Sequence, residues 1–156
     1  MNDLDQGAAA VARWAERTGM TVGVAESLTG GMVAAALAAA EGSSQWFRGA
    51  IVAYSSEVKH GLLAVPPGPV VSEPAARAMA ASTRRLLGAD LAVALTGAGG
   101  PSSQDGRSPG TVFLAVDGPA GAEAVELDLD GGPEQVCRSA AAAALDLLVA
   151  RLPASS

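Results

Sequence analysis

Three polar motifs interrupt otherwise apolar segments, and each contains residues that are able to do chemistry. The first, "ESLTGG" at 26–31, follows an apolar run and contains Ser27. The second, "YSSEVK" at 54–59, ends in Lys59. The third, "TGAGGP" at 96–101, is rich in glycine. Because ligands of open α/β sheets bind outside the carboxyl ends of the strands, we expect the three motifs to meet at one edge of a sheet.

Ser27 is predicted to lie at a strand-to-helix turn, beside a helix N-terminus. The free N–H groups of such a terminus favour negative charge. They could hold the oxyanion that forms when a serine attacks a carbonyl group, or a phosphate group of a ligand. A serine needs a base to become nucleophilic, and the motifs offer Glu26, Tyr54, Lys59 and His60. Lys59 can act as a base where burial or neighbouring positive charge lowers its pKa.

The same residues also have ordinary structural explanations. A serine before a helix is usually an N-cap, and a lysine on a helix usually points into water. The glycine-rich motif is not a P-loop, because no Gly-Lys-Ser/Thr follows it; it could bind phosphate through backbone amides or be a simple loop. Cys137 lies on the apolar side of the last predicted helix, where a core position is expected.

Composition narrows the classes of function. The 156 residues suffice for one domain with a hydrophobic core. A net charge of −6 and an aromatic content of 3% argue against a nucleic-acid partner, which requires clustered cations and stacking side chains. A single cysteine and a single histidine exclude an intrachain disulfide and CxxC-type zinc or redox sites. With no signal-peptide pattern and no long apolar stretch, we expect a cytoplasmic protein that does not bind membranes.

Hydrophobic periodicity predicts one domain over residues 1–156. The predicted helices cover residues 4–18, 29–40, 55–65, 73–87 and 133–152, the predicted strands 21–25, 50–54, 91–96, 111–117 and 122–129, and the predicted loops 41–47 and 97–110. The strand at 50–54 is apolar on both faces, whereas the strand at 122–129 alternates and is expected to pair antiparallel with its predecessor. The fold class is therefore α/β: a three-layer α/β/α domain with a mostly parallel sheet and an antiparallel edge strand.

Five segments occur in a recognisable order: "AESLTGG", "AYSSEVK", "VVSEPAARAMA", "LTGAGGP" and "SPGTVFLAV". From about Thr21 to Leu152 the chain resembles the CinA C-terminal domain family, which includes stand-alone nicotinamide-nucleotide amidases. The resemblance implies a serine amidase with no metal and no cofactor. Such enzymes hydrolyse the carboxamide of nicotinamide mononucleotide, a small-molecule nucleotide, to nicotinate mononucleotide and ammonia, and so recycle NAD. It also implies a homo-oligomer, with a dimer as the expected state.

The resemblance assigns roles by motif position. Ser27 matches the family nucleophile, and Tyr54 and Lys59 match the catalytic Tyr and Lys of the second motif. Glu26 is expected to orient its neighbours rather than to act as the base. The implied substrate-binding residues are Thr29, Gly30, Gly31, Thr96, Gly97 and Arg138.

The chain departs from the family at the start of the last predicted helix. Many members carry Gly-Asp-Arg there and a second arginine about four residues later, whereas this chain has Gly-Gly-Pro and then Cys137. Arg138 comes one residue later, which turns it by about 100° around the helix. If the family arginines hold the substrate phosphate, this chain binds the mononucleotide weakly, or Arg107 replaces the lost cation. Two alternatives therefore stay open: an amidase for another small amide, and a nucleotide-binding or regulatory domain without turnover.

Trp46 and Phe47 form the only adjacent aromatic pair of the sequence and fall in a predicted loop. Large aromatic side chains often anchor protein interfaces, so this pair could contribute to the expected oligomer. Alternatively, the two rings cover the edge of the core.

Overall fold

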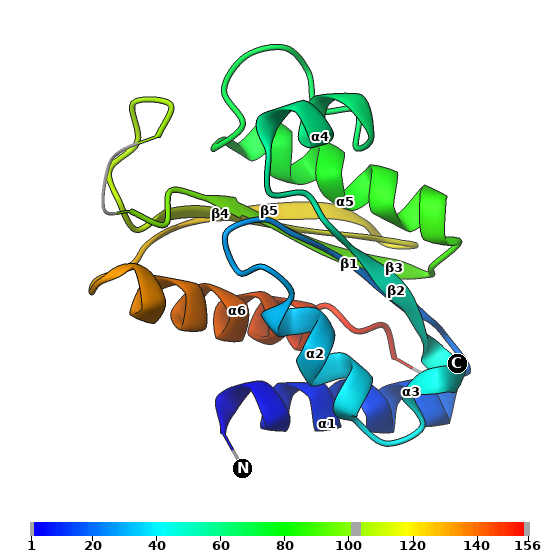
Figure 1. Ribbon diagram of the computed structural model, residues 1–156. Helices are drawn as coiled ribbons and strands as arrows, with labels where there is room; N and C mark the ends of the chain where they lie inside the picture. The colour runs from blue at the N-terminus through cyan, green and yellow to red at the C-terminus, as the bar shows by residue number, and fades with distance from the viewer. Residues whose placement is uncertain (1, 101–103, 155–156) are drawn as a thin grey trace.

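The sheet organises the whole chain. The structure, a computed structural model, describes residues 2–100 and 104–154 (Figure 1). Its five strands lie in the order β2-β1-β3-β4-β5. Their bounds are β1 (Val22–Glu26), β2 (Phe47–Val52), β3 (Leu91–Gly97), β4 (Thr111–Gly118) and β5 (Gly121–Asp128). β1 pairs in parallel with β2 and β3, while β4 runs antiparallel to both β3 and β5. The predicted fold class is confirmed, with β4 as the reversed strand.

Helices cover both faces of the sheet (Figure 1). Their bounds are α1 (Asp3–Thr18), α2 (Met32–Ala39), α3 (Ser43–Trp46), α4 (Ser56–Gly61), α5 (Glu73–Leu87) and α6 (Pro133–Ala150). α4 and α5 lie on one face, and α1, α2 and α6 lie on the other. Among the described helices, none is both long and apolar enough to cross a membrane.

The two faces of the sheet differ in the size of their side chains. Ala25, Ala94 and Ala115 belong to the cluster beneath α5, and their small side chains let this alanine-rich helix lie close to the sheet. Val93 and Leu95 belong to the larger cluster, which packs against α1, α2 and α6. This alternation along β3 buries every residue of the strand, as expected for a central strand covered on both sides.

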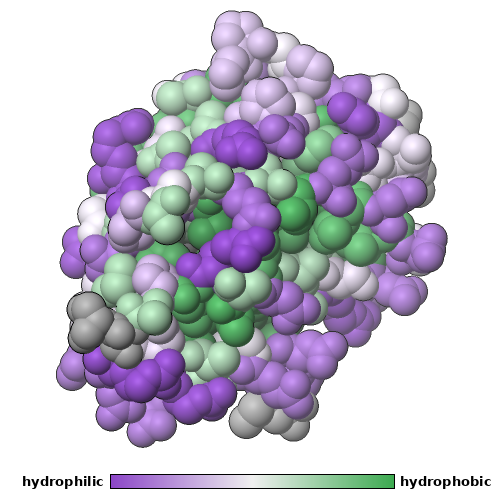
Figure 2. Space-filling model, turned by 180° about the vertical axis from the view of Figure 1, so that it is seen from behind, coloured by the Kyte–Doolittle hydropathy of each residue, from purple (hydrophilic) through white to green (hydrophobic). Residues whose placement is uncertain are grey.

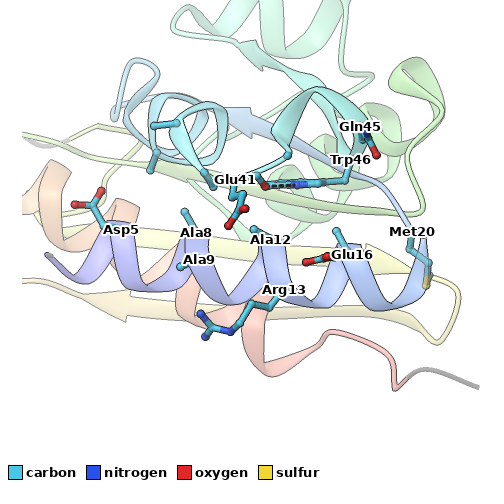
Figure 3. Close-up of a pocket in the computed structure, with 16 residues that line it drawn as sticks. Asp5, Ala8, Ala9, Ala12, Arg13, Glu16, Met20, Glu41, Gln45 and Trp46 are labelled. Carbon is cyan, nitrogen blue, oxygen red and sulfur yellow. Dashed lines mark hydrogen bonds between the residues drawn. The ribbon is translucent and has the colours of Figure 1, made fainter.

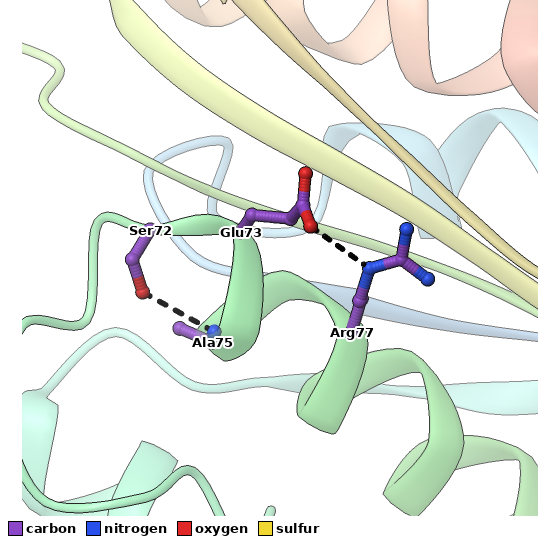
Figure 4. A network of polar contacts seen from close by, with 4 residues as sticks. All are labelled: Ser72, Glu73, Ala75 and Arg77. Atoms are coloured by element: carbon purple, nitrogen blue, oxygen red, sulfur yellow. Dashed lines mark hydrogen bonds and ion pairs between the residues drawn. The ribbon is translucent and has the colours of Figure 1, made fainter.

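The helix α5 begins and ends at the capping residues that the sequence predicts. The side chain of Ser72 accepts a hydrogen bond from the amide of Ala75, which caps the helix as predicted (Figure 4). One turn of helix separates Glu73 from Arg77, and the two form an ion pair on the exposed side (Figure 4). Gly88 ends the helix in the left-handed conformation.

The second strand differs from its prediction. It begins at Phe47 rather than at residue 50, and a four-residue helix, α3, precedes it within the predicted loop. Because β2 is an edge strand, its residues are half-exposed or exposed rather than buried on both faces. An apolar sequence alone does not distinguish an edge from the middle of a parallel sheet.

β5 follows its predicted alternation. Val125 and Leu127 pack against the core, while Glu126 and Asp128 are exposed. Seen from behind, the molecule carries a band of apolar residues between hydrophilic margins (Figure 2). β5 is thus a half-exposed strand, antiparallel to its predecessor as predicted.

The long segment between β3 and β4 contains a local turn where the sequence suggested only a loop. Gln104 and Arg107 exchange two backbone hydrogen bonds of 3.0 and 2.8 Å. Between them, Asp105 and Gly106 both have positive φ, of 52° and 73°, as in a type I′ turn. Pro101, the last residue of the third motif, lies outside the described residues.

Candidate active site

The three motifs meet at the carboxyl edge of the parallel strands. The amide of Ala53, just after β2, donates a 2.8 Å hydrogen bond to the carbonyl oxygen of Glu26, which precedes Ser27. Gly97 at the end of β3 faces Leu28, because a Cβ atom on Gly97 would lie 3.3 Å from the Leu28 side chain. The turn after β1, the loop after β3 and the start of α6 gather on the left of Figure 1.

Ser27 occupies the first residue after β1, and only 3% of its surface is exposed. Its carbonyl oxygen accepts a hydrogen bond of 3.1 Å from the amide of Gly30. Gly30 and Gly31 both have positive φ, of 62° and 118°, which L side chains rarely adopt. The two glycines thus let the chain reverse directly into α2 and fix Ser27 at the turn.

Glu26 is fully buried and ties the turn to the start of α2. One carboxylate oxygen accepts hydrogen bonds from the Thr29 hydroxyl at 2.6 Å and the Val33 amide at 3.0 Å. The other accepts from the Ala34 amide at 2.8 Å. All three bonds place the negative charge at a helix N-terminus, where it is stabilised. This geometry matches the orienting role expected for Glu26.

The hydrogen bonds of Glu26 limit which amides remain for a ligand. The amides of Val33 and Ala34 point to the carboxylate, and the Gly30 amide is already used within the turn. Within residues 2–100 and 104–154, the amides of Thr29 and Gly31 have no hydrogen-bond partner. These two N–H groups are therefore available to an oxyanion or a phosphate.

Lys59 is the largest side chain that is fully buried, with 2% of its surface exposed. It lies on α4, whose first turn is capped by the side chain of Ser55. Burial lowers the pKa of Lys59 from its ordinary value, and the negative charge of Asp105 partly opposes this shift. A lysine in this environment is easier to deprotonate than a solvated one, as a general base requires.

Tyr54 and His60 behave differently from Lys59. Tyr54 is 72% exposed, so it lies at the rim of the site rather than inside it. His60 donates a hydrogen bond from Nδ1 to the carbonyl oxygen of Val65 at 2.9 Å, which fits the structural explanation for this residue. Of the bases that the sequence offered, Lys59 and Glu26 are buried, and Glu26 already accepts three hydrogen bonds.

Thr96 and Gly97 shape the third side of the site. The buried hydroxyl of Thr96 donates a 2.7 Å hydrogen bond to the carbonyl oxygen of Val70, so its proton is not free for a ligand. A Cβ atom on Gly97 would lie only 2.8 Å from the side chain of Val112 and 3.1 Å from the carbonyl oxygen of Thr111. Glycine is therefore required at this close approach.

The start of α6 presents Cys137 to the site and turns Arg138 away from it. The half-buried thiol of Cys137 donates a hydrogen bond of 3.1 Å to the carbonyl oxygen of Leu28. Partial burial raises the pKa of this thiol, which keeps it protonated. Arg138 is exposed and pairs with Glu134 one turn earlier. Cys137 is thus a neighbour of Ser27 as well as a packing residue, and Arg138 does not join the other predicted site residues.

Arg107 lies on the hairpin between β3 and β4. Its guanidinium group is 5.2 Å from the ring centre of Phe113, within the range of a cation–π interaction. The side chain of Arg107 is exposed, so its positive charge faces solvent. The contact of this side chain is with Phe113, which belongs to β4.

A large groove of the described structure lies elsewhere. It has a volume of about 980 Å³ and runs between α1 and the α2–α3 segment (Figure 3). Alanine is the most frequent residue of its walls, with Trp46 at one end and the charged side chains of Asp5, Arg13, Glu16 and Glu41 around it. It contains none of the predicted site residues, and volume without a nucleophile or base does not define an active site.

Trp46 closes that end of the core. Its ring is buried, and its indole N–H donates a 3.0 Å hydrogen bond to the carbonyl oxygen of Glu41 (Figure 3). The ring centres of Trp46 and Phe47 are 6.3 Å apart. Of the two explanations for this aromatic pair, the structure favours cover for the edge of the core.

Two residues of the site were not anticipated from the sequence. Leu28 is the residue of the turn after β1 that Gly97, Gly99 and Cys137 approach. Asp105 lies close enough to Lys59 to influence its charge. The Asp105-Gly106 dipeptide is a strong signal for a two-residue hairpin and could have identified the turn, though not its electrostatic influence on Lys59.

Comparisons with known proteins show which family the chain resembles. The sequence matches the CinA C-terminal domain over residues 4–152. A CinA-like protein of Gloeobacter violaceus is 44% identical over 154 residues, which cover 94% of this chain and 36% of that protein. A second, from Anaeromyxobacter sp. (strain K), is 46% identical over 144 residues, covering 88% of this chain and 35% of the relative. The chain thus spans about a third of the length of these curated relatives.

Solved structures share the whole fold. The competence or damage-inducible protein from Enterobacter asburiae superposes with a TM-score of 0.92 at 30% identity, covering 98% of this chain and 100% of the other. The competence/damage inducible protein CihA from Agrobacterium tumefaciens gives a TM-score of 0.86 at 29% identity, with 96% of each chain covered. With a family match over residues 4–152 and the fold shared from end to end, the chain belongs to the CinA C-terminal domain family, a family of competence- and damage-inducible proteins.

Proposed function

We propose that this protein is a nicotinamide mononucleotide deamidase, which hydrolyses the carboxamide to nicotinate mononucleotide and ammonia and thereby serves NAD recycling. The observation that carries the proposal is that a buried serine and a buried lysine follow the carboxyl ends of two neighbouring parallel strands, β1 and β2. Ser27 is 3% exposed at the turn after β1, and Lys59 is 2% exposed on α4 with its pKa lowered. A serine that only caps a helix does not need to be buried, and neither does a lysine that points into water.

The proposed reaction begins with proton transfer from the Ser27 hydroxyl to the neutral amine of Lys59. The serine oxygen attacks the carboxamide carbon, and the carbonyl oxygen becomes an oxyanion. Collapse of this intermediate breaks the C–N bond, and Lys59 returns its proton to the leaving ammonia. Water then attacks the ester with Lys59 as base, which releases the carboxylate and restores the Ser27 hydroxyl.

The turn after β1 supports the proposed stabilisation of the oxyanion. The amides of Thr29 and Gly31 have no partner among the described residues, and both belong to the segment that follows Ser27. Their geometry is fixed by the positive φ of Gly31 and by the Glu26 carboxylate, which holds the Thr29 hydroxyl. Donors that are already oriented stabilise developing charge without reorganisation.

A second candidate is an amidase whose small amide substrate carries no phosphate. The specific observation is that Cys137, a neutral residue, contacts the carbonyl oxygen of Leu28, while Arg138 is exposed and paired with Glu134. A phosphate needs charged or multiple donors, which a thiol does not supply. The serine–lysine chemistry is the same in both candidates.

The deciding experiment incubates the purified protein with nicotinamide mononucleotide and measures nicotinate mononucleotide and ammonia. Ser27→Ala should reduce turnover by more than about a thousandfold and keep the melting temperature, since the hydroxyl is a small group. Ser44→Ala, an exposed serine of α3, is the matched control and should keep full activity. Ammonia from phosphate-free amides alone would favour the second candidate. Full activity of Ser27→Ala would exclude both.

A further inference from the structure

The segment between α4 and α5, residues 62–72, lies over Lys59 and is held at several points. The amide of Val65 donates a 3.1 Å hydrogen bond to the carbonyl oxygen of Lys59 itself. The hydroxyl of Ser82 on α5 donates to the carbonyl oxygen of Leu63 at 2.6 Å. Leu63 and Val65 are both buried. This segment therefore forms part of the wall that keeps water from the lysine.

The far end of the segment is fixed by an acid from another part of the chain. One carboxylate oxygen of Asp105 accepts hydrogen bonds from the amides of Val70 and Val71, at 2.9 and 3.1 Å. The carbonyl oxygen of Val70 accepts from the hydroxyl of Thr96 at 2.7 Å. Both valines are buried. Without these partners, buried backbone groups of the segment would lose their hydrogen bonds.

Asp105 reaches these amides because its own turn is tightly defined. Asp105 and Gly106 form the two-residue turn of the hairpin closed by Gln104 and Arg107. The positive φ of Asp105, 52°, is unfavourable for most side chains but tolerated by aspartate. The hairpin is also held to β4 by the contact of Arg107 with Phe113. The carboxylate is thus presented by a structured element rather than by a free loop.

We propose that Asp105 is a positioning residue, which ties the 104–107 hairpin to the 62–72 segment and so holds Lys59 in its buried position on α4. The inference rests on the proposed role of Lys59 as the base. Asp105 is 35 and 34 residues away from Val70 and Val71 in sequence, so the contact joins the hairpin that follows the third motif to the segment that follows the second. A fixed base is needed because small displacements of a catalytic group reduce the rate strongly.

The charge of Asp105 has a second consequence for Lys59. Among the described residues, it is the charged group whose Coulomb interaction raises the pKa of Lys59 against the larger effect of burial. Because Asp105 is exposed, water and salt screen part of this interaction. Removing the charge should lower the pKa of Lys59 further, whereas removing the whole side chain should also release the 62–72 segment.

Two variants separate these effects. Asp105→Asn keeps a side-chain oxygen that can accept from Val70 and Val71 but removes the charge. Asp105→Ala removes both. Asp146→Asn, an exposed acid on α6, is the control. The readouts are amide hydrogen exchange at Val70 and Val71, titration of the Lys59 amine by NMR, and the pH profile of amide hydrolysis.

Asp105→Ala should speed exchange at both valine amides and lower the turnover number by up to about a hundredfold. Asp105→Asn should retain slow exchange, while its Lys59 amine and the acid limb of its rate profile move to lower pH. Unchanged exchange in Asp105→Ala, or unchanged Lys59 titration in both variants, would overturn the proposal. Exchange and titration need no turnover, so they test Asp105 even if the protein hydrolyses no amide, in which case only the proposed function fails.

Discussion

The thiol of Cys137 lies 3.1 Å from the carbonyl oxygen of Leu28, the residue that follows Ser27. This distance places the first turns of α6 directly against the turn after β1, although 109 residues separate Cys137 from Leu28 in sequence. Arg138, the next residue, lies on the exposed side of the helix with Glu134. Of these two side chains, the one at position 137 is therefore the one that faces the turn containing Ser27.

Replacing Cys137 by arginine should improve the use of a phosphorylated substrate. A charge-assisted hydrogen bond contributes about 1.5–3 kcal/mol, so the KM for nicotinamide mononucleotide should fall roughly tenfold or more. Arg138→Ala, the matched control, should leave KM unchanged because its guanidinium group already pairs with Glu134 at the surface. Steady-state kinetics of both variants provide the measurement. A large rise of KM in Arg138→Ala would mean that this arginine reaches the substrate after all.

Removing the carboxylate of Glu26 should destabilise the fold. Glu26→Ala leaves the amides of Val33 and Ala34 without their partner, together with the hydroxyl of Thr29. Unpaired buried donors cost about 1–3 kcal/mol each, and partial hydration reduces the sum, so we expect a loss of about 2–4 kcal/mol in the free energy of unfolding. Urea denaturation measures it. Glu16→Ala, at an exposed position of α1, should change stability by less than about 0.5 kcal/mol. Equal stability of the two variants would contradict the capping role of Glu26.

Local sequence signals predicted five strands and all the described helices except α3, although β2 begins three residues earlier than predicted and α4 ends four residues earlier than predicted. Ser72 capped its helix as expected, and β5 alternated as expected, because caps and periodicity depend on residues that are close in the chain. The turn at Ser27 was also predictable, since an apolar strand followed by Thr-Gly-Gly has few alternatives. The edge position of β2 was not predictable, because strand order depends on contacts between distant segments.

The finer features of the candidate site depend on such distant contacts. Asp105 accepts hydrogen bonds from amides that lie 34 and 35 residues away, and no spacing in the sequence predicts this pairing. Cys137 reads as a core residue from its helix alone and becomes a neighbour of Ser27 only when α6 is docked on the sheet. Tyr54 is the opposite case, because its motif predicts a residue inside the site, whereas its side chain is exposed in the structure.

The exposure of Tyr54 sets an expectation for its removal. A positioned acid or base contributes about 10²–10⁴-fold to a rate, but a side chain that is 72% exposed is not held in one position. Tyr54→Phe should therefore reduce turnover by less than about tenfold and leave stability unchanged, whereas Lys59→Met should abolish turnover. Parallel kinetics and thermal melting of the two variants check this ranking. A loss of a thousandfold in Tyr54→Phe would show that the ring moves into the site when substrate binds.

The burial of Lys59 makes both activity and stability depend on pH in a defined direction. Burial lowers its pKa in the folded protein below the ordinary 10.5, which the unfolded chain retains. Between these two pKa values the unfolded chain binds more protons, so the free energy of unfolding rises with pH across this interval. Below the folded pKa the lysine is charged in both states, and the cost of burying the charge is fully present. The difference in unfolding free energy between wild type and Lys59→Met should therefore be flat at low pH and shift in favour of wild type as pH rises towards 10.5. Urea denaturation of both proteins over a series of pH values measures this difference, since groups common to both cancel. The rate of amide hydrolysis should rise with pH through the pKa of Lys59 in the folded protein, because only the neutral amine accepts the Ser27 proton. Two outcomes would mean that Lys59 is not the buried base: parallel stability curves of wild type and Lys59→Met, or a hydrolysis rate that does not change over this pH range.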